Sequence, residues 1–141
     1  MPVKFSILPH RALILFTYSG AVGLQESLDA VAACSAHPSY SPELRQLCDL
    51  TRVTSVERNS VKLLNMQAKV AENLRPGSTD LIVLFLATTP AGQQLAQSAR
   101  RSWEGLNSVI VLIHDREDEA LAMLGLPERR ICDLVSASAK A

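Results

Sequence analysis

The hydrophobic positions of the chain fall into two alternating kinds of segment. Apolar runs of strand length occur at Val3–Leu8, Ala12–Tyr18, Leu44–Leu50, Leu81–Ala87 and Val109–Ile113. The first two flank a short turn that contains Pro9, which predicts an antiparallel hairpin. The run Leu81–Ala87 is apolar at every position, as is typical of a parallel strand covered on both faces.

Helical spacing of apolar residues appears between these runs. It predicts helices over Leu24–Ser35, about Arg58–Leu74, a segment opened by Thr89 and Pro90, and Asp115–Leu124. Thr89 and Asp115 are residue types that cap helix N-termini. Gly125 and Pro127 form a stop signal after the last of these helices. The residues Thr51–Glu57 are more polar and predict a turn between the third strand and the second helix.

The resulting order of elements is ββαβαβαβα. Strands that alternate with helices favour an α/β fold with right-handed crossovers. We therefore expect a mixed, mostly parallel five-stranded sheet with one antiparallel edge strand and about four helices. No linker or repeat interrupts the pattern, so residues 1–135 are expected to form a single domain, and the small residues at 136–141 a frayed C-terminal tail.

The predicted helix at residues 58–74 has more apolar surface than a sheet requires. One stripe contains Val61, Leu64, Ala68 and Ala71, and a second stripe beside it contains Leu63, Met66, Val70 and Leu74. A helix that lies on a sheet needs an apolar arc of roughly 100°. The second stripe is therefore expected to meet a neighbouring helix, a partner chain or a ligand.

Composition limits the classes of function. The chain has 141 residues, 48% apolar and 20% charged, and its 14 basic and 14 acidic side chains cancel. Such a chain can bury a core unaided. A neutral total gives no electrostatic attraction for nucleic acid or an anionic membrane, so we expect neither as a partner.

The cysteines and the N-terminus bear on location. Cys34, Cys48 and Cys132 form no CxxC pair, and their spacing to the histidines matches no metal site, so reduced thiols and no metal or other cofactor are expected. The N-terminal apolar stretch is broken by Pro9, His10 and Arg11, unlike a secretory signal. The longest apolar run is too short to span a bilayer. These features predict a cytoplasmic protein.

Candidate chemistry gathers where the parallel strands end. Open α/β sheets bind ligands at this edge, and here the strand ends supply Asp49, Thr88 with Thr89, and His114 with Asp115. A carboxylate, hydroxyls and an imidazole could perform acid–base chemistry if they converged. The alternative is that Thr89 and Asp115 cap helices and that His114 is a solvated strand end. Because no phosphate loop, nucleophile elbow or HExxH motif is present, we expect no enzyme.

Four short motifs resemble the STAS domains, the family of bacterial anti-sigma factor antagonists, and the uncharacterised bacterial proteins that share their sporulation-antagonist-like fold. The motifs are Tyr18-Ser19-Gly20, His37-Pro38-Ser39-Tyr40, Asp49-Leu50-Thr51-Arg52-Val53-Thr54 and Glu119-Ala120-Leu121-Ala122-Met123-Leu124-Gly125-Leu126-Pro127. Together they span most of the chain in the order of the family. The resemblance implies a STAS-like sheet and a regulatory role based on protein contacts.

One departure from the family changes the expected role. Phospho-regulated STAS domains carry an Asp-Ser-Ser-Gly motif after the central strand, and one serine is the switch. With Val53 aligned, the corresponding residues here are Glu57, Arg58, Asn59 and Ser60. Asn59 takes the serine position and cannot be phosphorylated, so the resemblance implies the scaffold and a binding surface without the switch.

These observations lead to one main hypothesis and one alternative. The main hypothesis is a non-enzymatic STAS-like module that binds a protein partner or a second copy of itself, as a homodimer. Its expected contact residues are Asp49, Thr51, Arg52, Thr54, Glu57, Arg58, Asn59, Leu63, Met66 and Val70. The alternative is a protein that binds a small apolar molecule or lipid in a cavity beside the helix at residues 58–74.

Overall fold

The computed structural model describes residues 3–41, 43–56, 81–103 and 109–140. The strands are β1 (Val3–Leu8), β2 (Leu13–Val22), β3 (Arg45–Val56), β4 (Leu81–Leu86) and β5 (Val109–His114). The helices are α1 (Leu24–Ser35), α3 (Pro90–Trp103), α4 (Glu117–Met123) and α5 (Ile131–Lys140), with a short 3₁₀ turn, η1 (Pro9–Arg11). The expected helix at residues 58–74 lies outside the described residues. None of the described helices has the length and apolar character needed to cross a membrane.

The strands form one mixed sheet in the order β1-β2-β3-β4-β5. The hairpin β1/β2 is antiparallel, and the other neighbouring pairs are parallel. This arrangement confirms the α/β class and the five-stranded mixed sheet with its antiparallel edge strand. The turn of the hairpin is completed by Ala12, which adopts a left-handed conformation with φ of 51°.

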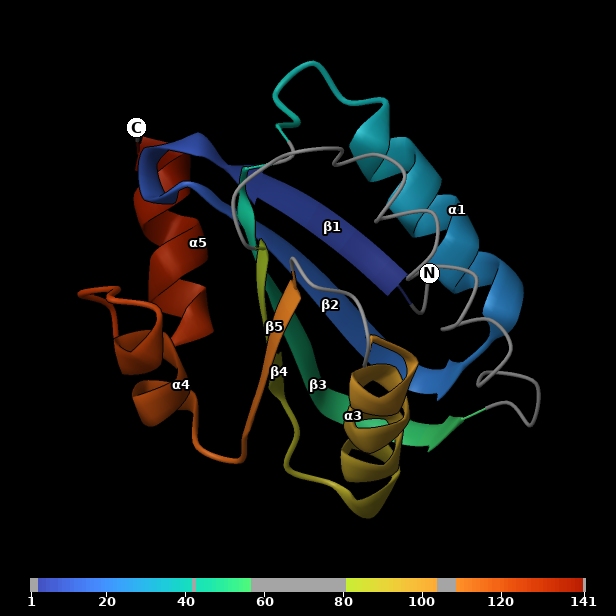
Figure 1. Cartoon of the computed structure of the whole chain (residues 1–141). Coiled ribbons are helices and arrows are strands. Elements are labelled where there is room, and N and C mark those ends of the chain that lie inside the picture. The colour runs from blue at the N-terminus through green and yellow to red at the C-terminus, as the bar shows by residue number, and fades with distance from the viewer. Residues whose placement is uncertain (1–2, 42, 57–80, 104–108, 141) are drawn as a thin grey trace.

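Helices cover both faces of the sheet (Figure 1), and each face has its own core. On one face, α1 and α3 pack through Cys34, Leu95, Ala96 and Ala99 against strand residues that include Cys48 and Leu50. On the other face, residues of α4 and α5 pack against strand residues that include Leu47, Leu84 and Leu86. We call these the α1/α3 face and the α4/α5 face. The alternation of Leu47 and Cys48 between the two cores follows the two-residue period of a strand.

The end of α4 forms a Schellman motif. Gly125, with φ of 71°, donates its N–H to the carbonyl of Ala122 at 2.9 Å, and Leu126 donates to the carbonyl of Leu121 at 3.0 Å. Leu126 and Leu121 both lie in the α4/α5 core. Glycine adopts this positive φ without the steric cost that a Cβ imposes. The stop signal predicted at Gly125 and Pro127 is thus confirmed.

Two predictions about these elements were wrong. The third strand does not end at Leu50, and the residues expected to form a turn continue β3 as far as Val56. Asp115 is not the cap of α4, because the N-cap position is Arg116 and no side chain caps the helix there. Of the residues expected to form the tail, 136–140 belong to α5 (Ile131–Lys140), whose side chains Ile131 and Leu134 are buried, and residue 141 lies outside the described residues.

Candidate functional site

The predicted contact residues that the structure describes lie together on β3. Asp49 and Thr51 are half-buried, whereas Arg52 and Thr54 are exposed. We call these four residues the β3 surface. The other predicted contact residues, namely Glu57, Arg58, Asn59, Leu63, Met66 and Val70, lie outside the described residues, and so does the double apolar stripe.

Three of the four residues of the β3 surface, Thr51, Arg52 and Thr54, lie where β3 extends beyond its neighbour β4. The pairing of β3 with β4 runs from Gln46 to Asp49, whereas its pairing with β2 continues to Val56. We call residues 51–56 the β3 extension. In the described part of the chain its strand partner is β2 alone.

A bulge sets which side chains of the β3 extension face the core. The register changes between the pairs Thr17↔Asp49 and Ser19↔Arg52, so β3 contains one more residue than β2 at this point. Leu50 and Val53 are both fully buried in the core of the α1/α3 face, although they are three residues apart. The extra residue of the bulge accommodates this odd spacing. Thr51 and Arg52 consequently both avoid the α1/α3 core.

Side-chain hydrogen bonds hold the β3 surface in place. The carboxylate of Asp49 accepts from the backbone N–H of Thr51 at 3.0 Å and from the Thr51 hydroxyl at 2.7 Å. The hydroxyl of Thr89 donates to the carbonyl of Val53 at 2.8 Å. The same Thr89 oxygen accepts from the N–H of Gly92 at 3.0 Å, so Thr89 caps α3 as predicted. One residue therefore ties the start of α3 to the β3 extension.

Gly92 makes this close approach possible. A Cβ at this position would lie 2.9 Å from the carbonyl oxygen of Leu50 and 3.1 Å from the Thr89 hydroxyl. The first contact is with backbone, which cannot rotate away. Only glycine lets the first turn of α3 lie this close to β3, so the Gly92 position and the Thr89 hydrogen bonds depend on one another.

The strand-end residues expected to converge for acid–base chemistry are used separately. Asp49 and His114 occupy one row of the sheet, with Leu86 on the strand between them. Two strand spacings separate their Cα atoms by about 9.5 Å. Leu86 is fully buried, and Thr88 is exposed. The Asp49 carboxylate instead accepts hydrogen bonds from Thr51. His114 contacts residues that follow it in the chain, namely Asp115, Arg116 and Glu119.

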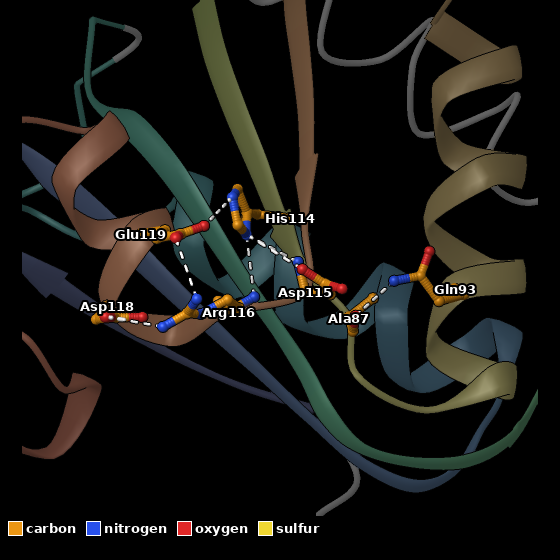
Figure 2. Close-up of polar contacts among 7 residues, drawn as sticks. All are labelled: Ala87, Gln93, His114, Asp115, Arg116, Asp118 and Glu119. Atoms are coloured by element: carbon orange, nitrogen blue, oxygen red, sulfur yellow. Dashed lines mark hydrogen bonds and ion pairs between the residues drawn. The ribbon is translucent and has the colours of Figure 1, made fainter.

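His114 organises the turn between β5 and α4 (Figure 2). Its Nδ1 accepts from the backbone N–H groups of Asp115 and Arg116, each at 3.0 Å, and its Nε2 lies 3.0 Å from the Glu119 carboxylate. A nitrogen that accepts two N–H groups carries no proton, so the neutral ring is the Nε2–H tautomer and donates to Glu119. The Asp115 carboxylate, 3.5 Å from Nδ1, therefore forms no ion pair with this tautomer.

The remaining polar contacts at this edge complete helix and strand ends (Figure 2). The guanidinium of Arg116 lies 3.3 Å from the Glu119 carboxylate and 3.6 Å from the Asp118 carboxylate. Gln93 of α3 donates to the carbonyl of Ala87 at 2.6 Å. His114 is thus neither the solvated strand end nor the proton-transfer partner of Asp49. It acts as a structural acceptor, which the sequence did not predict.

Two of the cysteines are core residues. Cys34 and Cys48 are buried, and Cys132 is exposed. Burial raises the pKa of the Cys34 thiol to about 11. Burial, and secondarily the charge of Asp49, raises the pKa of Cys48 well above its ordinary value. Because the thiolate is the reactive form, these two thiols are inert packing groups at neutral pH.

An arginine network lies at the opposite end of the sheet. Arg11 binds Glu128 through two hydrogen bonds, Nε to Oε1 at 3.1 Å and Nη2 to Oε2 at 2.6 Å. Arg45, at the start of β3, donates to the carbonyls of Leu124 and Arg11. The network joins the hairpin turn, β3 and the segment between α4 and α5. Sequence analysis missed it because these residues are far apart along the chain.

The Arg11–Glu128 pair predicts a specific dependence of stability on pH. The hydrogen bonds from Arg11 lower the pKa of Glu128. A carboxyl group with a lowered pKa in the folded state contributes stability above its unfolded pKa, and the contribution is lost as the pH falls through the folded pKa. We expect Glu128→Gln to unfold at lower urea concentration than wild type at pH 7, with the difference disappearing at pH values below the folded pKa.

The control for this experiment is Glu43→Gln, since Glu43 is exposed. This variant should follow the wild-type profile at every pH. A Glu128→Gln deficit that stays constant from pH 7 into the acid range would contradict the role of the Glu128 charge.

The sequence matches no protein-family model and no curated protein.

Proposed function

We propose that this chain is a non-enzymatic, STAS-like interaction module that binds a protein partner through the β3 surface. The observation that carries the proposal is the β3 extension, which projects beyond β4 with Arg52 and Thr54 exposed. The hydrogen bond from Thr89 to the Val53 carbonyl fixes the backbone of the extension. The hydrogen bonds between Thr51 and Asp49 fix side chains of the β3 surface. A surface fixed before binding avoids the entropic cost of ordering it on contact.

The chemistry of this surface suits a polar protein contact. Arg52 offers a guanidinium that can form bidentate hydrogen bonds with a carboxylate. Thr54 and Ser55, both exposed, add hydroxyl groups to the same stretch of β3. Such a surface supports recognition of an acidic segment on a partner, in keeping with the non-enzymatic regulatory role implied by the STAS resemblance.

Site-specific photo-crosslinking tests the proposal. A photo-reactive amino acid replaces Thr54 in one chain and Arg129 in a control chain, and each is irradiated in extract of the source organism. Arg129 is also exposed, but it follows Glu128 at the opposite end of the sheet. We expect a discrete crosslinked protein from position 54 that is absent from position 129.

The same experiment is repeated with Arg52→Glu, which reverses the charge of the β3 surface. The position-54 crosslink should decrease at least tenfold, because a like charge opposes the acidic partner. Equal crosslinking from positions 54 and 129, or a crosslink unaffected by Arg52→Glu, would contradict the proposal.

A further inference from the structure

The strand β5 forms an unusually apolar edge of the sheet. In the described part of the chain it pairs with β4 and has no strand on its other side. Its sequence is VIVLIH, and none of its side chains is fully buried. Ile110 is 43% exposed. Parallel strands normally lie covered within a sheet. Among the described residues, β5 is instead left with apolar side chains that are not fully buried and with one side of its backbone unpaired by a strand.

The opposite edge of the sheet is protected in a way that β5 is not. β1 has the exposed charge of Lys4 within it and is followed by Pro9. Charged residues and proline are the usual means by which proteins prevent edge strands from pairing with other chains. From Val109 to Ile113, β5 has neither. The two edges of one sheet therefore differ in their capacity to accept another strand.

The backbone direction of β5 identifies which of its hydrogen-bonding groups have no strand partner among the described residues. The carbonyl of His114 points toward β4, where it accepts from the N–H of Ala87 at 2.9 Å. Successive residues of a strand direct their backbone groups to opposite sides. The N–H and C=O groups of Val109, Val111 and Ile113 consequently point away from β4, at the open edge.

We propose that β5 pairs antiparallel with β5 of a second copy of this chain, about a two-fold axis at Val111. In this register Val111 faces the second copy's Val111, and Val109 faces the second copy's Ile113. Each of these facing pairs exchanges both of its hydrogen bonds, so every outward backbone group of β5 finds a partner. The edge is therefore complementary to itself, as a two-fold interface requires.

Side chains support the same register. Directly opposed residues of antiparallel strands point to the same face of the sheet. Ile110 then lies opposite the second copy's Leu112, between the hydrogen-bonded pairs. Both belong to the α4/α5 face, where Ile82 and Leu112 pack against the core. The pairing covers the exposed Ile110 with apolar surface from the second copy.

The test compares two apolar-to-lysine substitutions at positions of similar exposure. Ile110 is 43% exposed on β5, and Val135 is 40% exposed on α5. By sedimentation equilibrium, wild type and Val135→Lys should have twice the 15.3 kDa mass of the chain. Ile110→Lys should raise the dimer dissociation constant about 30-fold or more, because a lysine would face the second copy's Leu112. Its circular dichroism should match wild type.

Amide hydrogen exchange supplies an independent measurement on wild type. The amides of Val109, Val111 and Ile113 should become protected as protein concentration rises. A wild-type protein that stays monomeric, an Ile110→Lys variant that dimerises like wild type, or rapid exchange of these three amides at high concentration would each overturn the proposal. A monomer whose β5 edge takes a peptide from another protein is one such result. The β3 surface plays no part in this pairing, so the two proposals fail separately.

Discussion

Arg45→Met is expected to lower the free energy of unfolding by about 2–4 kcal/mol. Arg45 donates to the carbonyl of Leu124 and, at 2.9 Å, to that of Arg11. Hydrogen bonds to charged groups contribute about 1.5–3 kcal/mol each. Arg45 is half-buried, so water replaces part of what is lost. Urea denaturation followed by circular dichroism measures the difference.

The matched control is Arg52→Met, which makes the same change on the same strand. Arg52 is exposed. Its substitution should change stability by no more than about 0.5 kcal/mol, as is typical of surface positions. Equal losses in the two variants would contradict the role assigned to Arg45, because they would reflect a general effect of losing positive charge from β3.

Thr89→Ala is expected to lower the free energy of unfolding by about 1–3 kcal/mol. The substitution removes the cap of α3, which contributes about 0.5–2 kcal/mol. It also removes the donor to Val53, a hydrogen bond worth about 1 kcal/mol. Urea denaturation measures the loss, and amide exchange should accelerate selectively in the β3 extension.

Two further substitutions separate the hydroxyl of Thr89 from its other properties. Thr89→Ser keeps the oxygen and should retain most of the stability. Thr88→Ala changes the exposed neighbour and should leave both stability and exchange unchanged. If Thr89→Ala destabilised the protein without accelerating exchange in the β3 extension, Thr89 would be a helix cap that does not fix the β3 surface.

The sequence was sufficient to predict where the five strands lie because each contains a run of mainly apolar residues. Leu81–Ala87 could be assigned as a parallel strand from composition alone, and β4 occupies Leu81–Leu86. The helix Leu24–Ser35 was predicted with the bounds that α1 has. Local patterns were also sufficient for the Thr89 cap and the Gly125 stop, since each depends on residues adjacent along the chain.

The β3 extension was missed because polarity was given more weight than residue type. Its sequence, Thr51-Arg52-Val53-Thr54-Ser55-Val56, is rich in β-branched residues, which favour strands. Because of the bulge, the buried residues Leu50 and Val53 are three positions apart. The two-residue alternation of a regular strand therefore does not identify Val53 as a buried position. The helix α5 was missed for a different reason. Its buried residues Ile131 and Leu134 have helical spacing, but too few apolar residues follow them to extend the pattern.

Long-range contacts of the candidate site could not be predicted from local patterns. Thr89 and Val53 are 36 residues apart, and Arg11 and Glu128 are 117 apart. Only the folded sheet shows that Thr89 lies against the β3 extension. Likewise, the row formed by Asp49, Leu86 and His114 follows from strand register, which separates the two titratable residues that the sequence suggested might meet.

Competition in the photo-crosslinking assay tests the central claim, that the β3 surface binds a protein partner. Excess untagged wild-type chain is added before irradiation of the position-54 probe, in parallel with excess Arg52→Glu or Arg129→Glu chain. The account predicts that wild type and Arg129→Glu suppress the crosslink equally, whereas Arg52→Glu does not suppress it. Equal suppression by all three competitors would contradict it.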